Sequence, residues 1–352
     1  MSEQFKIDLP TFFEIGINKI GNLAQILVFH NMEFRKVLLL GDSKTFSIGG
    51  DSITRDFKKK NIKVLRHRIS NSDEPNVKTV RKLIAENKPD IIIGFGGGKV
   101  LDVAKLAAGL CQTKFISIPT TLSNDGISSP VSVIKNKNNI PVSHITKAPF
   151  GVIVDIAIIK KAPIRHIKAG VGDLISNLSA VFDARLAQSK NLEEISTTAL
   201  TLAEAGATNL LDFPHESIKS SEFLLSLTRG LIKSGFAMCI IGSSRPASGS
   251  EHKISHSLDH LYSSRKTLHG EQVGIAAIFT MFLQENPYFE KIMKFYTKIA
   301  FPQKLKKLFL NRDQFVKVVL NATKIRPERH TILEEKRPTA EEIKNIIREA
   351  KL

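Results

Sequence analysis

The stretch IIIGFGGGKVLDVAK, Ile91–Lys105, joins a short apolar run to three consecutive glycines and then to apolar residues at helical spacing. The apolar run predicts a buried strand, and the spacing after the glycines predicts a helix that starts at once. Such a turn is suited to hold a diphosphate. The glycines let the backbone come close, and the helix N-terminus supplies free N–H groups and a partial positive charge. A tight strand-to-helix turn is the structural alternative, but three glycines exceed its needs, so we expect a phosphate site here.

This turn matches neither standard phosphate-binding motif. The dinucleotide fingerprint requires a glycine where this chain has Lys99. The P-loop requires a glycine at the position of Ile93 and Ser or Thr at the position of Val100. The prediction of a phosphate site therefore rests on the physical features of the turn and not on a motif.

Around this turn, strand and helix signals alternate. Further strands are expected at residues 36–42, 62–70 and 114–121, and helices at 77–90 and 99–110. Strands separated by helices of this length predict a parallel sheet with helices on both faces. From Pro163–Gly170 onward the periodicity is almost only helical. We therefore predict an α/β domain at 1–165 and an all-helical domain at 166–352, with a ligand cleft between them.

Polar side chains follow two of the predicted strands. Asp42 either accepts from a ribose hydroxyl or caps the next helix, and the sequence does not choose between these roles. The loop PTTLSNDGISS at 119–129 offers Thr120, Thr121, Ser123, Asp125 and Ser129. Each of these residues alone is typical of turn chemistry. Ligands of open α/β sheets, however, bind at the carboxyl ends of the strands, where this loop lies.

Four of the ten histidines fall within Gly249–Gly274, at positions 252, 256, 260 and 269. On a helix the first three share one face, and His269 is expected to start the next helix. A catalytic zinc site needs three protein ligands and one open position, so two histidines would need a carboxylate. Asp173 is the candidate, at the expected start of the first helix of the second domain. The structural alternatives are an N-cap for Asp173 and a polar helix face for the histidines.

Composition and charge bound the protein class. The chain has 352 residues, of which 42% are hydrophobic and 24% charged. We see no apolar run of membrane-spanning length, and the first ten residues lack the features of a signal peptide. A cytoplasmic protein without membrane insertion is therefore expected. Cys111 and Cys239 lie in apolar runs and are expected to be two buried thiols. Two cysteines cannot form a disulfide framework or a CxxC zinc site.

The formal net charge of +17 raises the hypothesis of a nucleic-acid-binding protein. The basic residues are spread in short pieces, no run combines bases with aromatics, and tryptophan is absent. Dedicated nucleic-acid binding is therefore the remote alternative. A positive field also concentrates small anions such as phosphate esters.

Five segments taken together resemble a known family. They are, in order, GFGGGKVLD, SIPTTLSNDGISSP, GVGDLISN, SRPASGSEHKISHSLD and LHGEQVG. They resemble the sn-glycerol-1-phosphate dehydrogenases, within the superfamily of glycerol dehydrogenase, iron-type alcohol dehydrogenase and dehydroquinate synthase. Glycerol dehydrogenases share the glycine turn and LHGE but not SRPASGSEHKISHSLD. The resemblance runs from about Lys36 to about Gly274, and the chain from Pro287 onward is expected to be helical scaffold.

The resemblance implies a role for each matched residue. Gly96, Gly97, Gly98, Lys99 and Val100 would hold the diphosphate of NAD or NADP. Thr120, Thr121, Ser123 and Ser129 would line the nicotinamide, and Asp42 would meet the adenosine ribose. Asp173, His252 and His269 would bind one Zn²⁺ per subunit, and Asp125, Asp173 and His256 would contact the substrate. His260 matches no functional position.

The reaction implied by the resemblance is the reversible reduction of dihydroxyacetone phosphate to sn-glycerol 1-phosphate. Its product would supply the glycerophosphate backbone of archaeal-type membrane lipids. A related metal-dependent glycerol or alcohol dehydrogenase and a dehydroquinate synthase remain alternatives. The sequence leaves open the choice between NAD and NADP, the residues that hold the substrate phosphate, and whether the chain forms a homo-oligomer.

Overall fold

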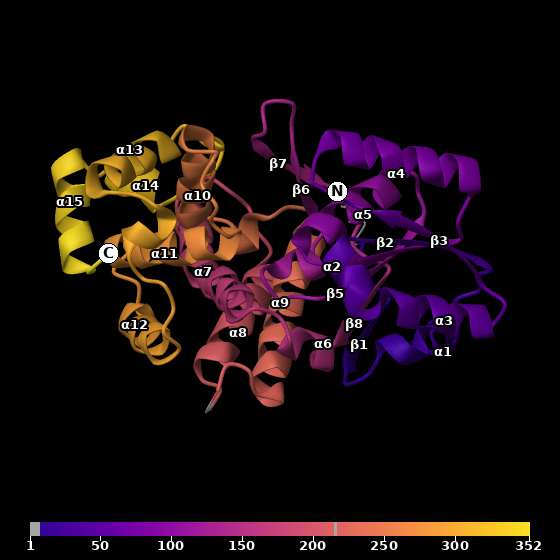
Figure 1. Cartoon of the computed structure of the whole chain (residues 1–352). Helices are drawn as coiled ribbons and strands as arrows, with labels where there is room; N and C mark the ends of the chain where they lie inside the picture. The colour runs from indigo at the N-terminus through magenta and orange to yellow at the C-terminus, as the bar shows by residue number, and fades with distance from the viewer. Residues whose placement is uncertain (1–7, 215–216) are drawn as a thin grey trace, which may run out of the picture. The chain divides into compact units, whose positions relative to one another are not determined.

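The computed structural model describes residues 8–214 and 217–352, and the chain divides into two compact units (Figure 1). Unit 1 runs to Leu122 and continues over Gly126–Pro163. Unit 2 comprises Ser123–Asp125 and Ile164–Leu352. The first seven residues, part of the segment that we used to argue against a signal peptide, lie outside the described residues.

A parallel sheet of six strands forms the centre of unit 1, as the alternating pattern predicted. In spatial order the strands are β1 (Phe12–Gly16), β8 (Gly151–Asp155), β5 (Lys114–Pro119), β4 (Ile91–Gly96), β2 (Lys36–Gly41) and β3 (Lys63–Arg68). The predicted strands did not include β1, β8 or the antiparallel hairpin of β6 (Val131–Lys135) and β7 (Pro141–Ile145). The patterns of β1 and the hairpin are weak because most of their residues are only partly buried or exposed, whereas the five residues of β8 are all buried.

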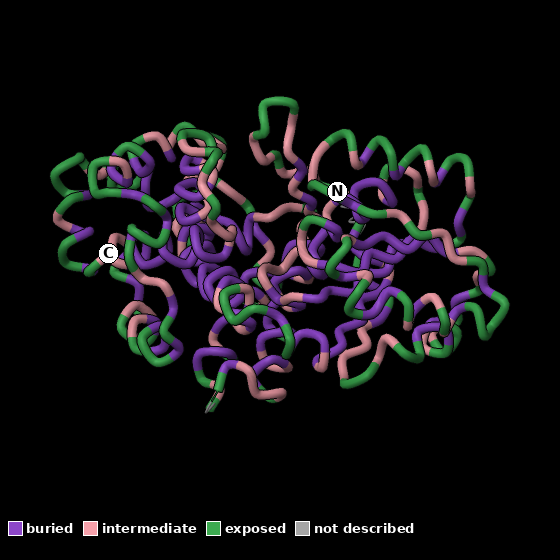
Figure 2. The backbone as a smooth tube through the Cα atoms, in the orientation of Figure 1, coloured by how far each residue is buried: buried purple, intermediate pink, exposed green. Residues whose placement is uncertain are grey.

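Helices cover both faces of this sheet (Figure 1). On one face, α1 (Leu23–Phe29) and α3 (Asp51–Lys59) bury Leu27 and Phe57 in one apolar cluster with strand residues. On the other face lie α4 (Glu74–Asn87) and α5 (Gly98–Leu110). The four inner strands, β8, β5, β4 and β2, are almost wholly buried (Figure 2), which explains their nearly continuous apolar sequences.

Unit 2 is built from helices and the loops that join them. The helices are α7 (Ile164–Ser189), α8 (Thr197–Leu211), α9 (Ser221–Ile241), α10 (Ser250–Leu261), α11 (His269–Leu283), α12 (Phe289–Lys298), α13 (Arg312–Ala322), α14 (Ile332–Lys336) and α15 (Ala340–Glu349). Serine hydroxyls cap the N-termini of two of these helices, Ser196 that of α8 and Ser220 that of α9. The parallel sheet and the helical region together confirm the predicted fold class.

The expected position of Asp173 at the start of a helix is wrong. Helix α7 begins at Ile164, so Asp173 lies well inside it. Gly170 and Gly172, which precede Asp173, are both helical and buried. The tight packing of this part of α7 against α11 offsets their low helix propensity.

Two expectations about apolar segments also need correction. Helix α9 is long and apolar enough to cross a membrane, although Glu222, Arg229 and Lys233 interrupt its apolar run. It packs against α8 and α7, and its apolar residues are mostly buried, so within unit 2 it is a core helix. Both cysteines are free, but only Cys239 is buried and Cys111 is partly exposed.

Candidate active site

The close approach of α7 and α11 places the first elements of the site in unit 2. A Cβ atom added to Gly172 would lie 2.2 Å from the carbonyl oxygen of Gly270. One added to Gly270 would lie 1.9 Å from the carbonyl oxygen of Ala169. Only glycine fits at this crossing, because backbone atoms cannot move away as a flexible side chain can. The crossing brings Asp173, the neighbour of Gly172, beside His269, the first residue of α11.

Three candidate metal ligands meet at this crossing. Asp173, His252 and His269 each offer an atom to one group whose members lie within 4.8 Å of one another. The Nε2 atoms of His252 and His269 are 3.1 Å apart, and His269 Nε2 is 3.6 Å from Asp173 Oδ1. The sequence analysis named these three residues as metal ligands, and the structure brings them together.

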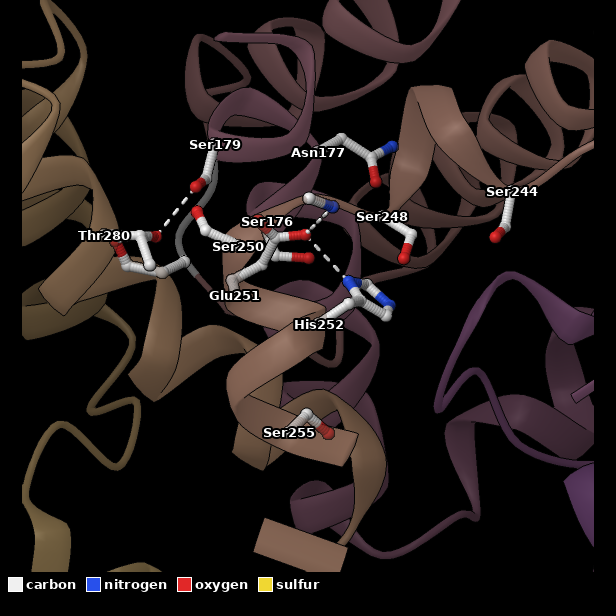
Figure 3. A network of polar contacts seen from close by, with 12 residues as sticks. Ser176, Asn177, Ser179, Ser244, Ser248, Ser250, Glu251, His252, Ser255 and Thr280 are labelled. Carbon is white, nitrogen blue, oxygen red and sulfur yellow. Dashed lines mark hydrogen bonds and ion pairs between the residues drawn. The ribbon is translucent and has the colours of Figure 1, made fainter. Parts of the chain in front are cut away.

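A buried glutamate fixes the orientation of one imidazole (Figure 3). Glu251 Oε1 lies 2.8 Å from His252 Nδ1 and also accepts a hydrogen bond from the backbone N–H of Gly249. If the carboxylate accepts from Nδ1–H, the lone pair of His252 is on Nε2, where it points to His269 and Asp173. Carboxylates commonly hold metal-binding histidines in this way. Glu251 was not among the predicted site residues, and its only signal in the sequence is its position next to His252.

The surroundings of the cluster keep the imidazoles neutral and raise the pKa of the Asp173 carboxyl. Burial, followed by the charges of nearby arginines, lowers the pKa of His252 to about 3. Burial, followed by the charge of His252, lowers the pKa of His269 to about 3. Burial and then the neighbouring Asp125 raise the pKa of Asp173 well above its usual range. A neutral imidazole is the form that binds metals, and a cation at this position would relieve the carboxylate crowding.

Asp125 is anchored beside Asp173 by bonds that lie within unit 2. Its backbone N–H donates to Asp173 Oδ2 at 2.9 Å. Its Oδ2 accepts from the Ser234 hydroxyl at 2.8 Å, and Asn177 donates to that hydroxyl at 2.9 Å. This side chain, which we predicted to contact the substrate, therefore has a defined position next to the candidate metal ligands.

The remaining two histidines of the segment, His256 and His260, lie in different surroundings. His256 is one turn after His252 on α10, and its ring centroid lies 6.3 Å from that of His252 and 6.4 Å from that of His269. Its ring nitrogens form no hydrogen bond with another described residue. His260 is exposed in the last turn of α10 and away from the cluster. A partly buried imidazole with available nitrogens suits a substrate contact.

The glycine turn of unit 1 has the geometry of an anion site. Strand β4 ends at Gly96 and α5 begins at Gly98, so Gly97 occupies the N-cap position without a side chain to cap the helix. The first N–H groups of a helix have no partner within it. A Cβ on Gly96 would lie 2.6 Å from Val100, whose own side chain is fully buried. Val100 could therefore meet a ligand only through its backbone.

The strand ends beside this turn carry the other predicted cofactor residues of unit 1. Thr120 is bonded through its backbone N–H to the carbonyl of Gly96 at 3.0 Å. The hydroxyls of Thr121 and Ser129 are buried without a hydrogen-bond partner among the described residues. Buried polar groups are normally satisfied, so these two hydroxyls are available to form hydrogen bonds with a bound cofactor. The donor set thus fits a cofactor such as NAD(P).

The sequence left open whether Asp42 caps a helix or meets a ribose, and its position in the structure is compatible with both roles. Its side chain caps α2 (Ser43–Thr45) by accepting from the Thr45 N–H at 2.8 Å. It also lies 3.8 Å from Lys99 Nζ, because β2 and β4 are neighbours in the sheet. Asp42 therefore caps a helix, and it stands at the same edge as the glycine turn. Ser123, the fourth predicted nicotinamide contact, belongs to unit 2 with Asp125.

Comparisons with known proteins agree with this geometry. A family model described as iron-containing alcohol dehydrogenase matches residues 14–163, which is most of unit 1. A glycerol-1-phosphate dehydrogenase [NAD(P)+] of Archaeoglobus fulgidus is 37% identical over 349 residues, covering 97% of each chain. The chain belongs to the glycerol-1-phosphate dehydrogenase family.

Other members and structures extend the comparison. The family member of Nitrosopumilus maritimus is 35% identical and covers 98% of this chain and 96% of its own. The structure of a glycerol dehydrogenase from Schizosaccharomyces pombe shares the fold, with a TM-score of 0.78, 20% identity and coverage of 99% of this chain and 91% of that one. The full-length match includes the region after Pro287, in which the sequence analysis found no motif.

Proposed function

We propose that this protein reduces dihydroxyacetone phosphate reversibly to sn-glycerol 1-phosphate with NADH or NADPH. The observation that carries the proposal is the three-ligand cluster of Asp173, His252 and His269 in a chain that belongs to the glycerol-1-phosphate dehydrogenase family. Full-length relatives named for this NAD(P)-dependent activity support it. The product would provide the glycerophosphate backbone of archaeal-type membrane lipids, and we expect the reaction in the cytoplasm.

Asp173, His252 and His269 would hold one divalent metal ion, which we propose is Zn²⁺. When bound, this ion would supply Lewis-acid polarisation of the substrate ketone. One carboxylate and two neutral imidazoles would be three protein ligands, the number typical of catalytic zinc sites. Glu251 would keep His252 in the tautomer that presents Nε2 to the ion.

Gly96, Gly97, Gly98, Lys99 and Val100 would bind the diphosphate of the nicotinamide cofactor, which supplies the hydride. Thr120, Thr121, Ser123 and Ser129 would orient the nicotinamide. The unpartnered hydroxyls of Thr121 and Ser129 support this role. The Asp42 carboxylate would accept from the adenosine ribose, which favours NAD, while the nearby Lys44 leaves NADP use open.

The remaining polar residues would position the substrate and move a proton. Asp125, held by Ser234 and by its own backbone bond to Asp173, would accept a hydrogen bond from a substrate hydroxyl. His256 would relay a proton from water to the substrate oxygen as reduction proceeds, accepting a proton on one ring nitrogen and passing on the proton of the other. Burial and then the charge of Arg326 hold the pKa of His256 well below its usual range, so the ring is neutral before and after the relay.

A product analysis tests the proposal. Purified protein with dihydroxyacetone phosphate and NADH or NADPH should yield glycerol phosphate that an sn-glycerol-3-phosphate dehydrogenase cannot oxidise. The His252→Ala protein should lose both bound metal and this product, whereas His256→Ala should keep the metal and lose turnover. Formation of the sn-3 enantiomer, or full metal occupancy in His252→Ala, would contradict the assignment.

A further inference from the structure

Two arginines lie in unit 2 on the loop between α13 and α14, in the region without a recognisable motif. Arg326 Nη1 donates to the hydroxyls of Ser248 at 3.0 Å and Ser244 at 3.3 Å. Arg329 donates to the Ser244 hydroxyl at 3.1 Å and to the Ser248 carbonyl at 3.2 Å. Both arginines are partly buried, so two guanidinium groups converge on the same two serines.

This pair lies beside the histidine cluster. Ser248 is in the segment that leads into α10, and it appears with Ser244 and His252 in Figure 3. After burial, the charge of Arg326 is a cause of the lowered pKa of His252, His256 and His269 alike. A charge that acts on all three imidazoles is close to the position where a substrate on the metal would bind.

Arg329 differs from a structural arginine of the same region. Arg245, which is 3% exposed, forms a two-pronged ion pair with Glu193 at 2.7 and 3.0 Å. By contrast, no carboxylate of the described residues lies within 4.0 Å of the Arg329 guanidinium. Burial, with the charges of Arg326 and Arg245, lowers the pKa of Arg329 to about 10, which leaves it charged at neutral pH. Two cations so close together favour a bound anion.

The loop that carries the pair is fixed by its surroundings. Fully buried Lys253 donates to the carbonyl of Arg329 at 3.1 Å. Arg245 donates to the carbonyl of His330 at 2.8 Å, and the N–H of Ile332 donates to Asp183 at 2.9 Å. An anion would therefore find the guanidinium groups already in position, without the entropic cost of ordering the loop.

We propose that Arg326 and Arg329, with the hydroxyls of Ser244 and Ser248, bind the phosphate group of the substrate. The planar guanidinium fork matches phosphate oxygens in pairs, and each serine hydroxyl can turn to donate. The inference rests on the proposed function, because it assigns the part of the site that distinguishes a phosphorylated triose from a free one.

The ratio of kcat/KM for dihydroxyacetone phosphate to that for dihydroxyacetone tests the inference. Arg329→Gln and Arg326→Gln should each lower this ratio about 10- to 100-fold, the range for loss of one charge-assisted hydrogen bond. Bound metal per subunit should be unchanged in both. The matched control is Arg312→Gln, which removes an equal charge from an exposed position on α13 and should keep the wild-type ratio.

A phosphate titration and a chemical modification of the wild type test the inference even if the variants fail to fold. Inorganic phosphate titrated into the metal-free wild type should bind once per subunit, and the two variants should lose this binding. In the wild type, phosphate should protect Arg326 and Arg329 from phenylglyoxal more than it protects Arg312. Unchanged ratios in folded variants, or no selective protection, would overturn the inference. A wild type that turns over only free dihydroxyacetone would instead overturn the proposed function.

Discussion

At the scale of single residues, the two ring nitrogens of His252 have different tasks. Nδ1 faces the buried Glu251, and Nε2 faces the other two candidate ligands. We predict that Glu251→Gln weakens metal binding about 10- to 100-fold, because an amide orients the imidazole less well than a carboxylate does. Competition with a fluorescent chelator measures the metal dissociation constant.

The control for this variant is Glu349→Gln, which removes a carboxylate from an exposed position on α15. It should leave metal affinity unchanged. If Glu251→Gln binds metal as tightly as the wild type, Glu251 does not position His252.

The lowered pKa of His252 predicts a pH dependence of stability in the metal-free protein. An unfolded histidine binds a proton near pH 6.5, whereas burial and arginine charges keep folded His252 neutral down to about pH 3. Between these values the unfolded state binds more protons, so the free energy of unfolding falls as the pH falls. From pH 6.5 to about 5 this residue should account for a loss of at most about 2 kcal/mol.

Urea unfolding of the chelated wild type and of His252→Gln at both pH values measures this loss. The variant should lose less stability than the wild type over the same interval. Burial raises the pKa of Glu251 to about 7, which has the opposite pH dependence, but both proteins keep this residue. Equal losses in the two proteins would show that His252 is not neutral in the fold.

At the scale of elements, the crossing of α7 and α11 connects packing to the site. We predict that Gly270→Ala lowers the free energy of unfolding by about 1–3 kcal/mol or more, because its Cβ would meet backbone atoms of Ala169. The same change should weaken metal binding, since the two helices carry Asp173 and His269. Gly21→Ala is the control, because nothing lies within 4 Å of its added Cβ. Wild-type stability and metal affinity in Gly270→Ala would rule out a tight crossing.

These elements also show what the sequence could predict. The strand, glycine turn and helix at Ile91–Lys105 were predictable because both periodicities and the turn residues agree locally. The true start of α7 could not be predicted. Gly170 and Gly172 locally favour a break, and only packing against a helix distant in sequence keeps them helical. Arg326 and Arg329 carry no spacing signal, since only folding brings them to the serines before α10.

At the scale of the whole molecule, the metal residues and most of the cofactor residues fall in different parts of the chain. The glycine turn and its neighbouring hydroxyls are in unit 1, and the metal ligands are in unit 2. We therefore predict that removing the metal abolishes turnover but leaves the dissociation constant for NADH within about twofold, because the residues that would hold the cofactor diphosphate are not metal ligands. A titration that follows NADH fluorescence before and after chelation measures this dissociation constant.

Returning Zn²⁺ to the chelated protein should restore turnover. If chelation instead weakens NADH binding tenfold or more, the two sites are coupled, and the assignment of separate cofactor and metal residues needs revision. The likeness to family members over the full chain length makes the same division expected in them.

The central claim is metal-dependent reduction of a phosphorylated triose at the cluster of Asp173, His252 and His269. Its most direct test is the rate of NADH or NADPH oxidation with dihydroxyacetone phosphate and with dihydroxyacetone, before and after chelation. We predict rapid oxidation with the phosphate, much slower oxidation without it, and loss of both on metal removal. Turnover of dihydroxyacetone but not of its phosphate, or full activity in the chelated protein, would contradict the claim.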